Sequence, residues 1–413
     1  MLDRGQVVNA GSNGTLWRGI APALLAIVFV MVAIVAVGHP QLIVDEGVHV
    51  PQIEAFMQGS VETQPNLAMV PGYHAVLAGL MQAMGLSSVG AMRVVGSLFG
   101  IAAAMVFYAI RRSQGDGDAL WSALLFFVLP LFYPYYFLAY TDILSLLIVL
   151  LAVWQGIRGR HIVAAVIMTL SLAVRQNNII WAAFLAAYAA WPAFMESHPG
   201  VATRVRGAIA MALPYLLPAI AFVAFWLWNG AIVYSPKIGG AHPDFAFRGG
   251  NVWFALLLFP LLFPVEAWAG LRSYVGDARL RPWLLLIPVV AAAVVKLRGS
   301  GDNHAFTDYF IRNAFIVYVM HHAWAKVVAG FLVGVAGCAI AYTRFRDPRG
   351  VLVYPFSALC LASSVLIENR YAMVPFALWM VFRERNSPRA MVVVWGAVSA
   401  VVAYGILNRH FML

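Results

Sequence analysis

Runs of about twenty apolar residues recur along almost the whole chain, and they constrain its fold more than any other feature. A helix needs roughly 20 apolar residues to cross about 30 Å of hydrocarbon, and the first such run covers 17–37. Hydrophobic residues make up 62% of the 413 residues and charged residues 11%, with a mean hydropathy of +0.82. Ordinary soluble domains do not have this composition. We therefore predict an all-α polytopic membrane protein in which residues 1–413 form a single transmembrane domain.

The apolar segments predict about 12–14 transmembrane helices, at roughly 20 residues per span. These segments are 17–37, 89–110, 119–138, 142–157, 161–174, 177–195, 207–228, 252–271, 282–297, 309–343, 351–367, 371–382 and 389–408. The segment 309–343 is expected to break near His321 and His322. A cleaved signal peptide is the less favoured interpretation of 17–37, because the run has no small-residue cleavage site.

The distribution of charge predicts the orientation in the membrane. If residues 1–16 are cytoplasmic and the spans alternate, fifteen arginines lie in the following cytoplasmic loops, as the positive-inside rule requires. Nine of the 17 acidic residues then lie on the opposite face. The basic excess is spread over short loops instead of forming a patch, so we predict the lipid bilayer, and no nucleic acid, as a partner. The long polar loops 38–88, 229–251 and 298–308 are external and are expected to form the functional site.

The first external loop carries an acidic pair, Asp45 and Glu46, directly after the first span. Two stretches of this loop, 44–59 and 71–85, have the pattern of amphipathic helices that lie in the membrane interface. Charge close to the bilayer is costly unless it is used or solvated. A purely structural interpretation is that Asp45 caps the first interfacial helix and that the helix dipole stabilises the negative charge of Glu46 in the first turn. Taken alone, the pair favours this structural interpretation.

Seven segments resemble, in order, the signature stretches of one known family. They are VDEGVHVPQIEAFMQG, VPGYH, YPYYFLAYTD, RQNNIIW, WNGAIVYSPKIGGAH, GDNHAFTDYFIR and IENRYAMVPFALW. The family is that of the dolichyl-phosphate-glucose-dependent alpha-1,2-glucosyltransferases, which add the terminal glucose to the lipid-linked N-glycan precursor. The resemblance implies a GT-C glycosyltransferase fold, a polyprenyl- or dolichyl-phosphate-linked hexose donor, inversion at the anomeric carbon, and a glycan hydroxyl on a lipid-linked oligosaccharide as acceptor.

An inverting transfer needs one carboxylate to deprotonate the attacking hydroxyl on the face opposite the leaving group. We predict Asp45 as this base and Glu46 as a supporting or acceptor-binding partner, with the reverse assignment open. A lipid phosphate needs cations and hydrogen-bond donors that stabilise its growing charge. The residues predicted to bind the donor phosphate or sugar are Arg175, Lys237, Asp302, Asn303, His304, Arg312 and Arg370. The residues expected at the acceptor are His49, Gln52, Asp142 and His242.

Three stretches depart from the family pattern. His304 and Ala305 stand where the family has Arg and His, 234–237 reads Tyr-Ser-Pro-Lys in place of Gly-Asp-Lys, and 63–66 reads Thr-Gln-Pro-Asn in place of Trp-Asp-Pro-Lys. These changes concern sugar or acceptor recognition more than the base. The sequence is therefore compatible with a sugar or an acceptor that differs from the one used by the eukaryotic enzymes.

The same residues bear on two alternative functions and on the need for a metal or cofactor. A multi-spanning secondary transporter is the main alternative, but transporters place polar residues at mid-membrane, whereas the acids here gather in external loops. A GT-C enzyme with a protein or envelope-polymer acceptor is the other alternative. Cys338 and Cys360 lie in apolar runs, and no metal-binding motif occurs, so we predict no cofactor and no essential metal. Only three lysines among abundant Ala, Val and Arg suggest a GC-rich bacterial genome. We therefore expect a bacterial inner membrane with a periplasmic site, or the endoplasmic reticulum membrane with a luminal site if the source is eukaryotic.

Overall fold

The computed structural model describes residues 11–195, 200–235, 247–277, 314–364, 366–384 and 386–408. The α-helices are α1 (Gly11–Gly38), α2 (Glu46–Met57), α3 (Gly72–Ala83), α4 (Val89–Ser113), α5 (Ala119–Val128), α6 (Thr141–Ile157), α7 (His161–Leu172), α8 (Ile179–Met195), α9 (Val201–Ala212), α10 (Leu216–Asn229), α11 (Gly250–Leu262), α12 (Pro264–Gly276), α14 (Ala314–His321), α15 (Ala323–Tyr342), α16 (Val353–Ala362), α17 (Met373–Phe382) and α18 (Ala390–Leu407). Short 3-10 helices are η1 (Tyr133–Phe137), η2 (Gln176–Asn178), η3 (Leu213–Tyr215), η7 (Pro348–Leu352) and η8 (Asn369–Ala372). The described residues form no strand, only an isolated bridge between Phe345 and Arg383. The predicted all-α class is confirmed.

The protein is an integral membrane protein with long apolar helices. Those long and apolar enough to cross a membrane are α4, Gln176–Met195, Val201–Asn229, α15 and α18. The helices α11 and α12 meet this criterion only together and are bent by 99° at their junction. By length, the described residues thus supply 5 spans, or up to 6 with the bent pair, which is fewer than the roughly 12–14 predicted from apolar segments.

Short helices and breaks account for much of the difference. The described apolar helices of 10–17 residues are Pro22–Gly38, Ala119–Val128, Thr141–Ile157, His161–Leu172 and Pro348–Ala362. The segment 119–138 is divided because α5 ends at Val128, two residues before Pro130, and proline cannot continue a helix. Pro264 starts α12 at the bend of 252–271. The break predicted near His321 and His322 is confirmed, since α14 ends at His321 and α15 begins at Ala323. The two predicted interfacial helices are present as α2 and α3, and 282–297 lies outside the described residues.

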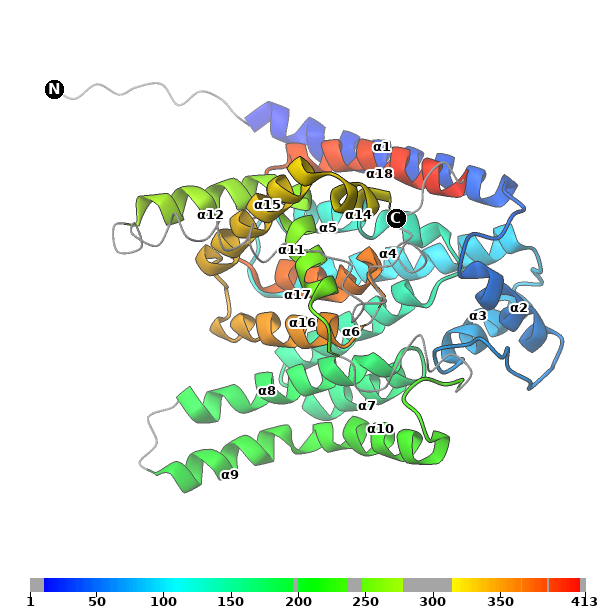
Figure 1. The fold of residues 1–413 in the computed structure, drawn as a ribbon, viewed down its shortest axis with the longest axis horizontal. Helices are drawn as coiled ribbons and strands as arrows, with labels where there is room; N and C mark the ends of the chain where they lie inside the picture. The colour runs from blue at the N-terminus through cyan, green and yellow to red at the C-terminus, as the bar shows by residue number, and fades with distance from the viewer. Residues whose placement is uncertain are drawn as a thin grey trace.

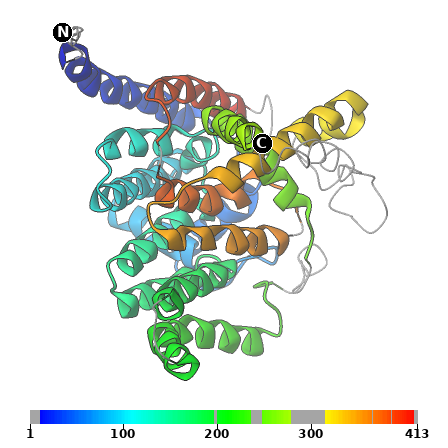
Figure 2. The same cartoon turned by 90° about the vertical axis from the view of Figure 1, so that its left-hand side faces the viewer.

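The helices form a bundle whose two ends differ. The pair α2 and α3 lies at the right-hand end of Figure 1, opposite the end where α8 finishes and α9 begins. Figure 2, turned by 90°, places α1 and α18 at one edge of the bundle and α8 to α10 at the other. In the sequence-based topology, the right-hand end is the external one. Both α2 and α3 therefore cover a single end of the bundle.

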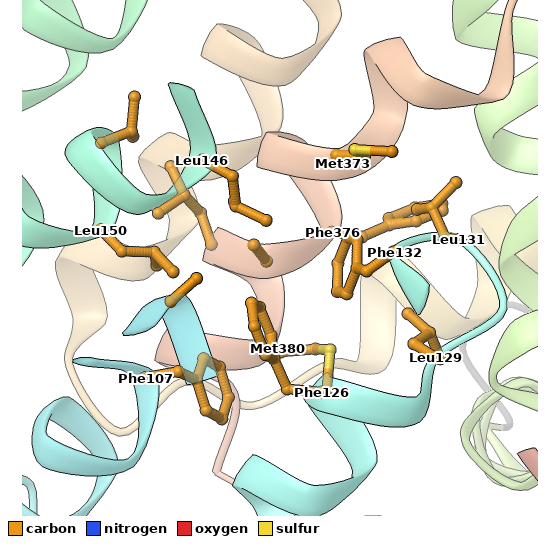
Figure 3. Close-up of a cluster of buried hydrophobic side chains, with 14 of the residues drawn as sticks. Phe107, Phe126, Leu129, Leu131, Phe132, Leu146, Leu150, Met373, Phe376 and Met380 are labelled. Carbon is orange, nitrogen blue, oxygen red and sulfur yellow. The ribbon is translucent and has the colours of Figure 1, made fainter. Parts of the chain in front are cut away.

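An apolar core joins α4, α5, α6 and α17 (Figure 3). Phe107 and Phe126 stack with ring centroids 4.6 Å apart, and Phe376 and Met380 of α17 belong to the same cluster. Dispersion contacts in such a core are individually weak but numerous. They fix α17, and with it the segment that precedes its first turn.

The close approach of Gly100 to Tyr136 gives a testable stability effect. A Cβ on Gly100 would lie 2.3 Å from Cδ1 of Tyr136, whose fully buried ring stacks on Phe127. We expect Gly100→Ala to destabilise the protein by about 1–3 kcal/mol, as overpacked sites do. Gly79→Ala is the control, because that Cβ would meet nothing within 4 Å. Thermal unfolding in detergent would measure both, and equal midpoints would contradict the packing.

Candidate active site

Asp45 lies at the start of α2, where the chain leaves α1 and turns along the end of the bundle. Tyr140 holds this turn, because its hydroxyl accepts a hydrogen bond from the Asp45 backbone N–H and donates one to the Ile43 carbonyl, both at 3.1 Å. The preceding Val44 has φ 47°, a conformation that is strained for a β-branched residue. The Asp45 side chain remains 33% exposed. The fold therefore presents this carboxylate at the surface on a tightly held backbone.

The Arg370 guanidinium lies beside Asp45 and is shared by three carboxylates. Its Nη2 lies 2.7 Å from Asp45 Oδ2, its Nη1 lies 3.7 Å from Asp142 Oδ2, and its Nε contacts Glu368 Oε2. Burial alone would lower the pKa of Arg370, but Glu368, Asp45 and Asp142 outweigh it and raise that pKa well above its ordinary value. Arg370 is thus a permanent cation, only 9% exposed, in contact with the exposed Asp45.

Asp142 lies between the two arginines that the sequence predicted at the donor. It occupies the first turn of α6, where a negative charge is favoured, and its side chain is 1% exposed. It forms an ion pair with Arg175 Nη1 in addition to the contact with Arg370. Both guanidinium groups lie over the ring of Tyr371, each 5.7 Å from its centroid. The structure therefore joins Asp45, Asp142, Arg175 and Arg370 in one cluster.

Two groups that the sequence reasoning missed position the Arg370 segment. The Asn251 amide of α11 donates to the carbonyls of Ser364 and Leu366 at 2.8 and 2.7 Å, and its oxygen accepts from the Glu368 backbone N–H at 3.1 Å. The Tyr135 hydroxyl donates to Asn369 Oδ1 at 2.6 Å. In the sequence, the only sign of such a role is that Asn251 and Tyr135 are polar side chains near the ends of apolar segments. These contacts fix the backbone that leads into Arg370.

Glu46 has a different environment from Asp45. Its carboxylate is fully buried, pairs with Arg93 at 2.6 and 3.0 Å, and accepts backbone N–H groups of Ile43 and Ala139, both at 2.9 Å. Arg93, on α4, also donates to the carbonyl of Ala36 in the last turn of α1 and to two carbonyls between α1 and α2. Arginine inside a span requires such partners. Glu46 thus holds the connection between α1 and α2, and solvent reaches only Asp45 of the acidic pair.

His49 and Gln52, both predicted at the acceptor, face inward from α2. His49 Nδ1 lies 2.9 Å from His74 Nε2 of α3, and burial lowers the pKa of His49 to about 4 and that of His74 to about 3. Gln52 donates to the Glu62 carbonyl at 3.2 Å and accepts from the Gln64 backbone N–H at 2.6 Å. These side chains tie α2 to α3 and to the loop that contains Glu62 and Gln64.

Six of the predicted site residues lie outside the described residues: Lys237, His242, Asp302, Asn303, His304 and Arg312. Their binding roles remain predictions. Within the described part of the chain, no group of three or more His, Cys, Asp or Glu residues could hold a metal ion. Cys338 and Cys360 are buried free thiols. The described cluster can supply a solvent-reachable base, together with one buried and one half-buried cation for an anion.

Comparisons with known proteins agree with this chemistry. The model of the DIE2/ALG10 family matches residues 39–381. A Drosophila melanogaster protein named "Dol-P-Glc:Glc(2)Man(9)GlcNAc(2)-PP-Dol alpha-1,2-glucosyltransferase" is 25% identical over 416 residues, covering 89% of each chain. A Mus musculus protein of the same name is 27% identical over 444 residues, which cover 89% of this chain and 90% of the mouse protein. A third, from Rattus norvegicus, is 26% identical over 409 residues, covering 81% and 82%.

Proposed function

This chain belongs to the DIE2/ALG10 family, and we propose that it transfers glucose from a polyprenyl-phosphate carrier to a hydroxyl of a lipid-linked oligosaccharide. The enzyme is an alpha-1,2-glucosyltransferase of the membrane, as its relatives are by name. The observation that carries the proposal is the partly exposed Asp45 carboxylate 2.7 Å from the buried Arg370 guanidinium. A base and an anion-binding cation adjoin there, as a transfer from a sugar phosphate requires.

Asp45 is the base in the proposed reaction. Its carboxylate takes the proton of the acceptor hydroxyl while the hydroxyl oxygen attacks the anomeric carbon of the glucose. The bond from that carbon to the phosphate oxygen breaks, and the polyprenyl phosphate leaves from the opposite face, which inverts the anomeric centre. Glu46 is unsuited to this step, because its carboxylate is fully buried and already bound by Arg93 and two backbone N–H groups.

Arg370 and Arg175 stabilise the charge that grows on the leaving phosphate. Charge-assisted hydrogen bonds from arginine to phosphate are stronger than neutral ones and can be bidentate. Asp142 contacts both guanidinium groups and so keeps them adjacent. The predicted donor residues Lys237 and Arg312 would add further positive charge from the external loops.

An apolar cavity of about 150 Å³ offers a path for the start of the isoprenoid chain. It lies between α11, α15, α16 and α17, and its lining includes Phe376 and Trp379. Phe376 lies in α17, which begins three residues after Arg370. Burying apolar lipid surface there contributes about 25 cal/mol per Å². A carrier with its phosphate at Arg370 would therefore have an apolar surface beside it.

The test is a transfer assay with purified protein in lipid vesicles. Labelled polyprenyl-phosphate-glucose is offered with Glc(2)Man(9)GlcNAc(2)-PP-Dol, and the product is digested to establish the linkage. We expect one added glucose in an alpha-1,2 bond and release of polyprenyl phosphate. Transfer from the carrier to a protein or envelope polymer would replace the acceptor part of the proposal. Movement of the donor across the vesicle without a glycosidic product would refute it.

A further inference from the structure

Arg248 is a cation at the external end of the bundle that the proposed reaction does not use. Its backbone N–H donates to the Ala362 carbonyl at 2.7 Å, which places it where α16 ends, two residues before α11 begins. Its side chain is half-buried. Within the described part of the chain no ion pair includes Arg248, and its buried Nη1 has no hydrogen-bond partner.

A buried and unpaired guanidinium nitrogen is costly in the free protein. Such a donor loses its hydrogen bonds to water and gains none in exchange, and the loss is larger for a charged group. The other arginines that the structure describes at this end are Arg93, Arg175 and Arg370, and each has a carboxylate partner. Among these four arginines, Arg248 is therefore the one whose charge the protein itself leaves unpaired.

The apolar cavity between α11, α15, α16 and α17 ends beside Arg248. Val252, four residues after Arg248, and Leu361, near the end of α16, line the cavity at its external end. The lining continues along α11 to Phe259, about 10 Å deeper at 1.5 Å per residue. Ala358 of the lining is exposed, so the cavity reaches the outer surface of the bundle. An apolar chain can enter there from the bilayer, with a cation at the external end of its path.

The residue before Arg248 is suited to contact with lipid. Phe247 is 63% exposed, and an apolar ring exposed to this extent is more stable against lipid than against water. An arginine beside such a ring can extend its guanidinium toward the headgroup layer. Phe247 and Arg248 together match the depth at which lipid phosphates lie.

The loop between α16 and α17 connects Arg248 to Arg370. Arg248 bonds to Ala362 at the start of this loop, and Arg370 lies at its end. One side chain, that of Asn251, bonds two carbonyls of the loop and the backbone N–H of Glu368. The loop is therefore compact, and the two cations flank it above the same cavity.

We propose that Arg248 binds the phosphate of the polyprenyl-phosphate-glucose donor whose isoprenoid chain enters this cavity, and that it acts together with Arg370. This inference rests on the proposed function and adds a binding residue to it. Arg370 already shares its charge among three carboxylates of the protein. Arg248 supplies a positive charge that no described carboxylate uses, so it strengthens the attraction for an anionic lipid.

The first test is the equilibrium binding of polyprenyl phosphate, without sugar, to the purified protein in phosphatidylcholine nanodiscs. We expect Arg248→Gln to raise the Kd by about 10-fold or more, the effect of losing one hydrogen bond to a charged group. Arg248→Lys should restore part of the affinity, because lysine also binds phosphate as a point charge. An equal Kd for wild type and Arg248→Gln would overturn the inference.

Two controls show whether the phosphate is what Arg248 recognises. Arg272→Gln removes an exposed arginine of α12, on the cytoplasmic side in the sequence-based topology, and should bind polyprenyl phosphate as wild type does. Polyprenol has the chain without the phosphate, and its binding should be the same in wild type and Arg248→Gln. If Arg272→Gln weakens binding as much as Arg248→Gln, the inference is overturned.

Phosphatidylglycerol separates the carrier from an ordinary bilayer phospholipid. We expect it to displace polyprenyl phosphate at least 10-fold less effectively, because its two acyl chains do not fit a cavity sized for the start of one isoprenoid chain. Equal displacement that depends on Arg248 to the same extent would assign the site to bilayer phospholipids and overturn the assignment to the donor.

Thermal unfolding separates ligand binding from a structural role. Because the Arg248 side chain has no ion pair in the described structure and a buried unpaired nitrogen, Arg248→Gln should unfold at the wild-type midpoint or above it. Polyprenyl phosphate should raise the midpoint of wild type more than that of Arg248→Gln, as a ligand of the folded state does. A lower midpoint for Arg248→Gln with unchanged stabilisation by polyprenyl phosphate would make Arg248 a structural residue.

The transfer assay distinguishes this inference from the proposed function. In Arg248→Gln the KM for the donor should rise about 10-fold with a smaller change in kcat, because the phosphate is held in both the ground state and the transition state. A wild-type KM in an active Arg248→Gln enzyme would overturn the inference and leave the proposed function intact. If polyprenyl phosphate binding depends on Arg248 but wild type transfers no glucose, the substrate assignment fails and the lipid-phosphate site stands.

Discussion

Asp45→Asn is expected to lower kcat for glucose transfer by about 10²–10⁴-fold, the usual contribution of a general base. The amide has the shape of the carboxylate but cannot accept the hydroxyl proton. Donor binding should be retained or strengthened, because Arg370 keeps Glu368 and Asp142 and no longer pairs with a charged residue 45. Single-turnover transfer and equilibrium binding of polyprenyl-phosphate-glucose would measure the two effects separately.

The control for this substitution is Glu54→Gln, which also replaces a carboxylate by its amide. Glu54 lies in α2, away from Arg370, and this variant should transfer glucose at the wild-type rate. Wild-type turnover by Asp45→Asn would show that another group removes the proton. A loss of donor binding equal to the loss of rate would instead assign Asp45 to substrate binding.

Glu46→Gln should give the largest loss of stability, about 3–5 kcal/mol, because breaking a buried ion pair leaves an uncompensated charge. Arg93 and Glu46 are both fully buried, and the remaining Arg93 charge would lose its only carboxylate partner seen in the described structure. The measurement is thermal or denaturant unfolding in detergent, supported by the yield of monodisperse protein.

A double variant shows whether the effect belongs to the pair. Glu46→Gln combined with Arg93→Gln removes both charges, so its loss should be smaller than the sum of the two single losses. Arg93→Gln alone should be severe, since Arg93 also donates to the carbonyls of Ala36, His39 and Gln41. A stable Glu46→Gln protein without transferase activity would reverse the assignment and make Glu46 the base.

The sequence predicted the presence of the helices better than it predicted their lengths. The helical structure of the stretches 44–59 and 71–85 and the break after His321 follow from local periodicity and polarity, and both are confirmed. The position of these two helices in the membrane interface stays a prediction. The 99° bend between α11 and α12 was not predicted. Pro260 and Pro264 fall inside one apolar run, and hydropathy alone cannot tell a kinked span from two helices, because proline in a membrane helix is tolerated where neighbours satisfy the backbone.

The site was predicted in part. Asp45, Asp142, Arg175 and Arg370 were each predicted as site residues, and the structure brings these four together. The contact of Arg370 with Asp45 joins residues 325 positions apart, and no spacing rule predicts such a contact. The role of Arg93 was missed, although a lone arginine within an apolar helix signals a buried partner. Separating Asp45 from Glu46 required the burial of each carboxylate, which the sequence does not contain.

A structure of the protein bound to a non-transferable polyprenyl-phosphonate-glucose would test the central claim most directly. The account predicts the phosphonate within hydrogen-bond distance of Arg370 and the anomeric carbon facing Asp45 on the side opposite the phosphonate. A phosphonate bound away from Arg370, or an anomeric carbon out of reach of the Asp45 carboxylate, would contradict it.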